Sequence, residues 1–393
     1  MKILVCNAGS TSLKFKFYEM PECTVLAQCQ MERVGSDHDA IFRYENCLSG
    51  QTDAFEKADI PDYENGIRLF LRYLTGEEYG VISSVTEIDR VGFKAALSKG
   101  HSGIFELDQE VLQGMEDWLC LAPLHNRAYL TAIRVMRDFL PDALFIGCFE
   151  TAFHRDIPLE RRLYGVPFEW YERYGLMRIG YHGASHGYIA DVLNARGRGY
   201  KAISCHLGGS GSVCAIDDGK SVDSSFGMSL ESGLIHASRV GDMDAGLPYF
   251  LREQGLSDTE ILEGMQKYGG LLGISGVSSD LRYVLEAAEA GNERARLAVG
   301  AFITGIVHYI GAFAMDLGGL DYLVFTAGIG EHSAYIRSRV CEKLGLLHVK
   351  IDEEKNLRNE TDISAADSAV RVLVIPTDEE LGIARRTYEY CRG

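Results

Sequence analysis

The chain has 393 residues, of which 46% are hydrophobic and 24% are charged, a composition typical of a soluble globular protein long enough for two domains. The net charge of −17 argues against a nucleic-acid partner, because phosphate backbones bind basic surfaces, yet it does not exclude a small anionic substrate in a local basic pocket. The apolar run at the N-terminus is too short for a signal peptide, and none of the ten cysteines forms a C-x-x-C pair, so a cytoplasmic protein with reduced thiols is expected.

The first stretch with chemical character, in chain order, reads CNAGSTSLKF and spans residues 6–15. An apolar run precedes it, and apolar residues alternate with lysines after it, so the pattern predicts two strands joined by a turn. Backbone N–H groups in a tight Gly/Ser turn can form an anion-binding nest, to which hydroxyl groups add donors. The stretch is therefore either an ordinary hairpin or one wall of a phosphate site, in which Asn7, Ser10, Ser12 and Lys14 would bind the anion.

Two charged residues follow apolar runs in the next part of the chain. Lys94 lies in RVGFKAALSKG, and Glu150 ends the strand predicted within residues 143–154. Ligands collect at the carboxyl ends of strands in alternating α/β sheets, so both residues are candidates for a cleft. The motif GASHG at residues 183–187 matches G-x-S-x-G and raises an alternative from another class, a serine hydrolase that uses Ser185 at a strand–turn–helix elbow.

A second hairpin is predicted over residues 202–222, where two apolar strands flank the turn GGSG and a third strand follows DDGK. The candidate anion-binding residues of this turn are His206, Gly208, Gly209 and Gly211. Two hairpins of the same pattern, far apart in the chain, indicate two domains of related architecture.

The last third of the chain alternates apolar runs with helical patterns, which fits a layered α/β protein. The apolar stretch at residues 297–315 is nearly long enough to span a membrane, but its interrupting polar residues and glycines favour a buried core helix. Helices are also predicted over residues 280–296 and 378–390. Between them, TAGIGEHS predicts a strand that passes through a glycine turn, at Gly328 and Gly330, into a helix whose N-terminus favours anions.

Two further charged side chains, Arg239 and Glu379, also follow apolar runs, and the charged residues form no obvious nucleophile–base pair. Phosphoryl transfer needs such a set, because it requires anion nests, cations over the transferring group and carboxylates for a metal, but little covalent chemistry from the protein. The residues therefore favour a phosphotransferase.

Ten motifs in order make the chain resemble the acetate kinase family, within the superfamily of acetate and sugar kinases, Hsp70 and actin. The likeness runs from end to end, and it is specific because so many motifs occur in sequence. The motifs are NAGSTSLKF, APLHN, FETAFH, YGLMRIGYHGASH, HLGGSGSV, GKSVDSSFG, SRVGDMD, LLGISGVSSDLR, FTAGIGEHSAYIR and VIPTDEELGIARRT.

The resemblance implies an α/β protein with two ribonuclease-H-like (actin-like ATPase) domains and a nucleotide cleft between them. It implies one domain of residues 1–149 plus 381–393 and a second, nucleotide-binding domain of residues 150–380. The implied reaction is reversible transfer of the γ-phosphate of ATP to acetate, giving acetyl phosphate and ADP. Mg²⁺ or Mn²⁺ is the implied cofactor and a homodimer the implied assembly, with no membrane or nucleic-acid partner.

The resemblance also implies roles for individual residues. The catalytic positions of the family match Lys94, Glu150, His182 and Arg239, and its magnesium site matches Asn7 and Glu379. The substrate-binding positions match Lys94, Ala96, Leu124, Tyr181, Leu230 and Arg239. The nucleotide-binding positions match Asn7, Ser10, Ser12, Lys14, His206, Gly208, Gly209, Gly211, Asp280, Leu281, Arg282, Gly328, Ile329, Gly330 and Glu331.

Several positions depart from the family pattern. Lys94 stands where the family has an arginine and Glu150 where it has an aspartate, so a point charge replaces a bidentate fork and the carboxylate is one methylene longer. In the acid pocket, Ala96, Tyr181 and Leu230 replace a valine, a phenylalanine and a proline. Propionate, butyrate, another phosphoryl donor, or a nucleotide-binding homologue without turnover therefore stay open beside acetate.

Overall fold

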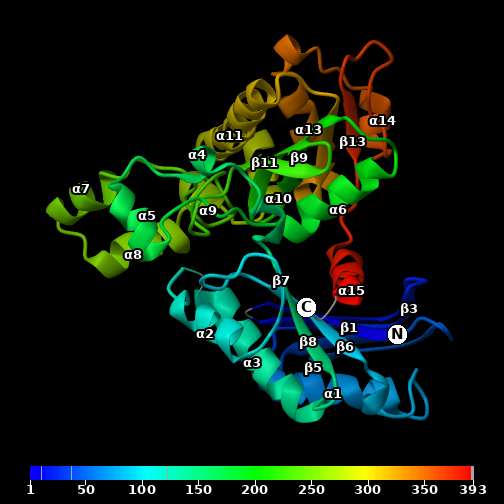
Figure 1. Cartoon of the computed structure of the whole chain (residues 1–393). Coiled ribbons are helices and arrows are strands. Elements are labelled where there is room, and N and C mark those ends of the chain that lie inside the picture. Colours follow the sequence, from blue (N-terminus) through cyan, green and yellow to red (C-terminus); the bar gives the residue numbers. More distant parts are fainter. Residues whose placement is uncertain (10, 37, 122, 391–393) are drawn as a thin grey trace. The chain divides into compact units, whose positions relative to one another are not determined.

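The computed structural model describes residues 1–9, 11–36, 38–121 and 123–390, with the backbone alone of residues 123–125. The chain divides into two compact units, which Figure 1 shows as ribbons. Unit 1 consists of Met1–Ala152 and Asp378–Gly393, and unit 2 of Phe153–Thr377. Each unit contains one mixed sheet with helices packed on it, so the predicted α/β class is confirmed.

The sheet of unit 1 has eight strands in the order β5-β4-β3-β2-β1-β6-β8-β7. Strands β1 to β5 are antiparallel neighbours, whereas β6 is parallel to both β1 and β8. The strand–turn–strand prediction for the N-terminus is confirmed, because β1 (Lys2–Gly9) pairs with β2 (Ser12–Glu19). The other strands are β3 (Thr24–Glu32), β4 (Ala40–Asn46), β5 (Gln51–Ala58), β6 (Arg90–Ala95), β7 (Ile104–Glu106) and β8 (Leu144–Phe149).

Helices cover both faces of this sheet. The alternation in β2 places Leu13, Phe15 and Phe17 on one face, where Phe15 stacks on Phe70 of α1 with ring centroids 4.3 Å apart. On the opposite face α15 packs through Ile383 against residues of β1 and β8, which confirms the helix predicted after residue 378. The helices of unit 1 are α1 (Tyr63–Thr75), the short η1 (Val85–Glu87), α2 (Gln109–Asp117), α3 (Pro123–Phe139) and α15 (Glu379–Glu389).

The sheet of unit 2 has five strands in the order β11-β10-β9-β12-β13. The predicted second hairpin is confirmed: β9 (Lys201–Leu207) and β10 (Gly211–Asp217) are antiparallel, and β11 (Lys220–Ser224) follows a two-residue turn. Asp218 and Gly219 in that turn both have positive φ, of 45° and 86°, as a two-residue hairpin loop requires. Strands β12 (Tyr322–Thr326) and β13 (Arg371–Val374) add to β9 in parallel.

The helices of unit 2 correct two predictions. The single helix predicted over residues 280–296 is wrong, because α10 ends at Glu289 and Asn292 caps a new helix. The glycine turn after β12 is also wrong, because α12 starts at once and contains both glycines. The short η2 (Ala152–His154) begins at the last residue of the first segment of unit 1. The other helices are α4 (Leu159–Arg162), α5 (Phe168–Tyr174), α6 (Gly183–Asn194), α7 (Leu247–Glu253), α8 (Asp258–Gln266), α9 (Gly270–Ser275), α10 (Leu281–Glu289), α11 (Glu293–Leu317), α12 (Ala327–His332), α13 (Ala334–Cys341), η3 (Gly345–Leu347) and α14 (Glu353–Leu357).

Helix α11 is the core helix of unit 2, as predicted for the apolar stretch. By length and composition it is the one helix of the described residues that could cross a membrane, and 44% of its most apolar window is buried inside the chain. Its inner face, with Phe302, Ile306 and Ile310, packs in the same apolar cluster as Leu207 and Val213 of the sheet. On its outer face, Leu297 and Met315 are exposed in the part of the chain that the structure describes.

Candidate active site

A largely buried lysine, with 17% of its side chain exposed, lies between two carboxylates in unit 1. The Nζ atom of Lys94, near the end of β6, is 2.6 Å from Oε2 of Glu379 and 3.7 Å from Oε1 of Glu150. Glu150 follows β8 directly, and Glu379 is the first residue of α15. Because β6 and β8 are parallel neighbours, their carboxyl ends meet at the same edge of the sheet, as the pattern of the sequence suggested.

The charged side chains in this group shift one another's pKa values. Burial alone would lower the pKa of Lys94, but the carboxylates of Glu150 and Glu379 outweigh it and raise that pKa well above its usual value. Burial raises the pKa of Glu150 to about 7, with Lys94 opposing the shift. Both carboxylate oxygens of Glu150 are buried without a hydrogen-bond partner among the described residues. Unsatisfied buried oxygens of this kind indicate a ligand site.

Asn7 and Tyr129 complete the group in unit 1. The Tyr129 hydroxyl, from α3, donates to Oδ1 of Asn7 over 3.4 Å, and its pKa is raised by burial, with Lys94, Glu150 and Glu379 all close enough to influence it. The sequence analysis missed Tyr129, because nothing in the sequence separates it from an ordinary core aromatic of a helix.

The oxygen atoms of this group fit the implied cation. Mg²⁺ prefers oxygen ligands, and it is usually held by one or two carboxylates with water and substrate phosphates rather than by a complete protein cage. Glu150 and Glu379 offer carboxylates and Asn7 an amide oxygen. The described part of the chain contains no cluster of three or more His, Cys, Asp or Glu side chains that could hold a metal ion without such help.

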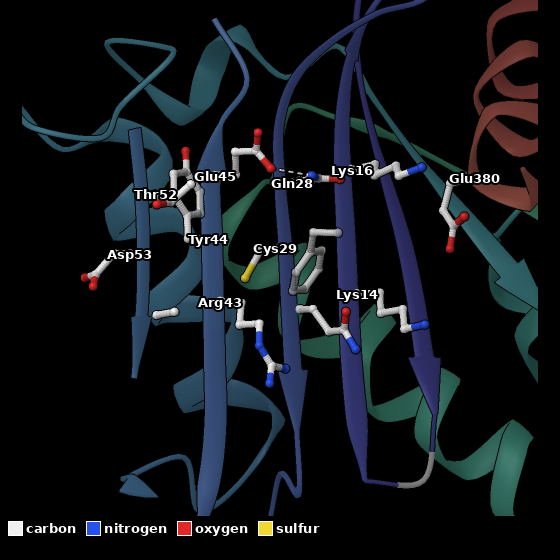
Figure 2. Close-up of a pocket in the computed structure, with 13 residues that line it drawn as sticks. Lys14, Lys16, Gln28, Cys29, Arg43, Tyr44, Glu45, Thr52, Asp53 and Glu380 are labelled. Carbon is white, nitrogen blue, oxygen red and sulfur yellow. Dashed lines mark hydrogen bonds between the residues drawn. The ribbon is translucent and has the colours of Figure 1, made fainter. Parts of the chain in front are cut away.

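Lys14 lies on the polar face of the sheet, directly across from Asn7. Antiparallel partners share a face, and the row continues from Lys14 through Gln30 to Arg43 on neighbouring strands. Lys14, Gln30 and Arg43 line a cavity of about 440 Å³, which Glu380 of α15 also lines. Figure 2 shows Lys14, Arg43 and Glu380 in this cavity. Ser12 starts β2, whereas Ser10, the remaining member of the predicted first phosphate loop, lies outside the described residues.

The raised pKa of Glu150 predicts how stability changes with pH. Between about pH 4.5, the ordinary value, and about pH 7, native Glu150 keeps a proton that the unfolded chain has lost. Raising the pH through this window therefore favours unfolding, and the effect is complete above the native pKa. Glu150→Gln, which cannot titrate, should gain stability relative to the parent chain as pH rises through the window. Urea midpoints measured in EDTA will check this, and parallel pH profiles of the two proteins would contradict it.

In unit 2 a group of histidines and serines lies around His182. His182 caps the N-terminus of α6 with a left-handed backbone, φ 57°, a conformation that is uncommon for a residue other than glycine. Its Nδ1 is 2.8 Å from Oγ of Ser212, and its ring stacks on that of His206 with centroids 4.0 Å apart.

The nucleophile-elbow alternative is not supported by this arrangement. The element directly before α6 among the described residues is the helix α5 and not a strand, so Ser185 does not stand at a strand–turn–helix elbow. The Ser185 side chain is completely buried, and its Oγ lies 2.8 Å from Nδ1 of His206. Ser185 is part of the support of the histidines rather than an exposed nucleophile.

Arg239 is a half-buried cation that has no partner among the described residues. Its guanidinium makes no hydrogen bond or ion pair with any residue that the structure describes, although arginine has five donors. Burial lowers its pKa, and the more distant Glu231 and Tyr181 offset part of that shift. A desolvated and unpaired guanidinium is costly to keep unless an anion binds to it.

In the second glycine loop, the backbone amides of Gly208 and Gly209 are suited to binding an anion, whereas the amide of Gly211 already donates a hydrogen bond within the protein. Gly208 and Gly209 lie in the turn between β9 and β10. Gly211 starts β10, and its backbone N–H donates to Nδ1 of His236 over 3.2 Å. His206 itself, at the end of β9, is 8% exposed.

The predicted adenosine residues occupy two helix ends in unit 2. Asp280 caps α10 and forms an exposed ion pair with Arg282, at 2.5 Å. The Leu281 side chain is 5% exposed and belongs to the core, so it can offer a ligand only its backbone. Gly328, Ile329, Gly330 and Glu331 lie within α12, where Oε1 of Glu331 accepts a hydrogen bond from the Thr377 backbone.

The C-terminal end of α12 is held by Arg337, a completely buried side chain. Its guanidinium donates to the backbone oxygens of Gly330 and Glu331 at 2.9 and 2.8 Å. It also donates to Oδ1 and the backbone oxygen of Asn356, both at 2.7 Å, and to Oδ1 of Asn359 at 2.6 Å. Sequence reasoning missed this residue, because arginines are usually exposed.

The predicted acid pocket is described in part. Ala96 is 4% exposed in unit 1, and Tyr181 is 2% exposed in unit 2, where its hydroxyl donates to the Met228 backbone oxygen over 2.7 Å. The Tyr181 hydroxyl proton is therefore already donated to a backbone oxygen of the protein. Leu230 is partly exposed, and the Leu124 side chain lies outside the described residues.

Comparisons with known proteins give consistent matches. A family model described as the Acetokinase family matches residues 2–385. The acetate kinase of Halothermothrix orenii is 41% identical over 397 residues, which cover 98% of each chain. The crystal structure of Porphyromonas gingivalis acetate kinase matches with a TM-score of 0.86 at 36% identity and covers 98% of both chains. A propionate kinase structure from Francisella tularensis matches with a TM-score of 0.91 at 29% identity, covering 99% of this chain and 100% of its own.

Proposed function

Because the chain belongs to the acetokinase family, we propose that it transfers the γ-phosphate of ATP to acetate, reversibly, giving acetyl phosphate and ADP. It is a phosphotransferase whose acceptor is a carboxyl group. The proposal is supported by the close likeness to acetate kinases over nearly the whole chain. The structural observation that supports it best is Arg239, a half-buried guanidinium without a partner among the described residues.

The chemistry asks for cations and alignment rather than for a general base. A carboxylate substrate is already ionised at neutral pH, because the pKa of such acids lies near ~4. Attack on the γ-phosphate then needs in-line alignment and stabilisation of the charge on the equatorial oxygens. We assign this stabilisation to Arg239 and His182, with Gly208 and Gly209 as backbone donors to the phosphates.

The group in unit 1 has two roles in the proposal. Asn7, Glu150 and Glu379 would hold Mg²⁺ or Mn²⁺, which supplies positive charge to phosphate oxygens when bound. Lys94 binds the anionic substrates, and it also offsets the two carboxylates when no cation is present. Ser12 and Lys14 of β2 are assigned to phosphate binding in this proposal, and Ser10, which has the same assigned role, lies outside the described residues.

The adenosine moiety of ATP is assigned to the helix ends in unit 2. The backbone of Asp280, Leu281 and Arg282 and the first turn of α12 would contact it, with Glu331 as a candidate acceptor for a ribose hydroxyl.

The identity of the acid depends on a few apolar contacts. One methylene changes binding by only ~1–3 kcal/mol, so propionate and butyrate stay alternatives to acetate, as does another phosphoryl donor. The likeness to the Francisella propionate kinase gives the propionate alternative a specific basis. Ala96 in place of a valine enlarges the pocket, whereas Tyr181 in place of a phenylalanine adds a hydroxyl that is bound to Met228.

The test is trapping of the acyl phosphate by hydroxylamine. Purified protein with ATP and Mg²⁺ should form the hydroxamate with acetate, and parallel reactions with propionate, butyrate, GTP and pyrophosphate will rank the acids and donors. Addition of EDTA should stop the reaction. If no acid gives a hydroxamate although calorimetry shows ATP binding, the chain is a nucleotide-binding homologue without turnover and the proposal fails.

We also propose a homodimer in the cytoplasm, supported by the outer face of α11. In this apolar helix, Leu297 is 61% exposed and Met315 is 80% exposed. Exposed large apolar side chains on one apolar helix are typical of an interaction surface. Light scattering should give twice the chain mass of 43.5 kDa, and a monomer at assay concentration would contradict the proposal.

A further inference from the structure

A continuous chain of hydrogen bonds leads from the core of unit 2 to His182. The Oγ of Ser204, on β9, is 3.0 Å from Nδ1 of His186, and Nε2 of the same ring is 2.8 Å from Oγ of Ser212. The Ser212 Oγ is in turn 2.8 Å from Nδ1 of His182. Ser204, His186 and Ser212 are all completely buried. They come from three different elements, β9, α6 and β10, so the chain depends on the tertiary structure.

Only two arrangements of the protons give every hydrogen bond between Ser204 and His182 one donor and one acceptor. Burial lowers the pKa of His186 well below its usual value, and the neighbouring His154 and His206 lower it further, so the ring is neutral. A neutral imidazole donates through one nitrogen and accepts through the other, and a serine hydroxyl donates one proton. The protons therefore all point toward His182 or all point away from it.

Ser204 decides the direction. Its hydroxyl has no hydrogen-bond partner other than His186 in the part of the chain that the structure describes. If Ser204 accepted from His186, its own proton would be buried without an acceptor, at a cost of about 1–3 kcal/mol. Ser204 therefore donates to Nδ1 of His186. The Nε2–H of His186 then donates to Ser212, and the Ser212 proton goes to Nδ1 of His182.

The same reasoning applies to the ring that stacks on His182. Ser185 is completely buried, and Nδ1 of His206 is the partner of its hydroxyl among the described residues. A donor role for Ser185 satisfies both groups and places the proton of neutral His206 on Nε2. In both stacked imidazoles, a hydroxyl proton from a separate serine thus goes to Nδ1, and the ring proton of the neutral form is on Nε2.

We propose that Ser204, His186 and Ser212 are positioning residues that hold neutral His182 as its Nε2–H tautomer. His182 then presents a hydrogen-bond donor to a phosphoryl oxygen without having to be charged. An acceptor nitrogen at that place would repel the oxygen. The inference rests on the proposed function for the identity of the ligand, but the tautomer itself is a property of the protein alone.

The native protein gives the first test. Long-range ¹H–¹⁵N spectra of protein labelled with ¹⁵N-histidine, recorded above about pH 8 where an ordinary histidine is neutral, report which nitrogen carries the proton. His182→Gln identifies the His182 signals. We expect Nδ1 of His182 to show the shift of an unprotonated nitrogen and Nε2 that of a protonated one. The reverse pattern would overturn the proposal.

Substitutions along the chain give the second test. Ser204 makes no contact with His182 in the hydrogen-bond chain, which runs through His186 and Ser212. Ser204→Ala should nevertheless convert the single tautomer of His182 into a mixture, because the donor that fixes the direction of these hydrogen bonds is gone. Ser204→Thr keeps the hydroxyl and should restore the native pattern. Ser221→Ala is the matched control. The Oγ of Ser221 makes an equivalent 2.8 Å hydrogen bond to the buried Nδ1 of His154, and neither residue belongs to the series of hydrogen bonds that ends at His182. An unchanged His182 spectrum in Ser204→Ala would contradict the proposal.

Kinetics then separate positioning from a structural role. Ser212→Ala should lower kcat about tenfold or more while KM for ATP changes little, and Ser221→Ala should leave both unchanged. A rise in KM together with a fall in kcat and a lower melting temperature would indicate a structural role only and would count against positioning. Failure of the hydroxylamine assay in the native protein would remove the proposed function, whereas the tautomer spectra would still decide this inference.

Discussion

Lys94→Met is expected to lower kcat by about 10³-fold, the largest effect of any single substitution in the group of unit 1. The methionine keeps the length of the side chain but removes the cation that lies 2.6 Å from Glu379 and 3.7 Å from Glu150. Two buried carboxylates then share the site without a cation, and one of them takes up a proton at neutral pH. The substrates lose a positive contact, and the cation site loses an ionised ligand. Steady-state kinetics by the hydroxylamine assay will measure the effect.

The controls for Lys94 use the departures from the family pattern. Lys94→Arg keeps the charge, but the larger guanidinium meets Glu150, which is one methylene longer than the aspartate of the family. The single variant should therefore lose more activity than the double variant Lys94→Arg/Glu150→Asp, which restores the combined length. A Lys94→Met protein that keeps more than a tenth of the native kcat would contradict the assigned role.

Arg239→Ala is expected to lower kcat/KM by about 10²- to 10³-fold, as the loss of one transition-state donor does. The same substitution should leave the melting temperature unchanged or raise it, because it removes a half-buried charge that has no partner among the residues that the structure describes. Loss of activity without loss of stability distinguishes a binding role from a structural one. The measurements are steady-state kinetics and a thermal melt of the same preparation.

Two further substitutions make the Arg239 result interpretable. Arg239→Lys keeps the charge without the planar fork, so it should recover part of the activity. Arg252→Ala removes an arginine whose ion pair with Asp258 is exposed, and it should change neither kinetics nor stability. If Arg239→Ala lowers the melting temperature as well as the activity, the guanidinium has a structural partner that the proposal does not include.

Much of the site could be predicted because strand ends are visible in the sequence. Both hairpins were predicted from alternation and turn residues, and Lys94 and Glu150 lie together because β6 and β8 are parallel neighbours. One helix boundary was missed although local signals mark it. The break between α10 and α11 depends on Gly291, with φ 95°, and on the cap at Asn292. A glycine that follows a helix end and an asparagine that caps the next helix are both visible in the sequence, so the Gly-Asn pair predicts this break.

Some site properties depend on contacts between distant segments. Leu281 was assigned to the nucleotide from a motif, but its side chain belongs to the core of unit 2. Gly211 has its amide occupied by His236, from a loop that is not adjacent in the sequence. Ser204, Ser212 and Tyr129 become recognisable only when their partners are known, because a buried serine or tyrosine has no distinctive sequence pattern.

Arg337 has a consequence for how unit 2 responds to its surroundings. Its charge is compensated by backbone and amide oxygens at the end of α12 and around α14, and no carboxylate of the described residues lies within ion-pair distance. Salt screens exposed ion pairs, but it has little access to dipoles in a dry interior. The end of α12 is therefore held by contacts that are insensitive to ionic strength. The shape of this part of the chain should stay constant under conditions that alter its many surface ion pairs.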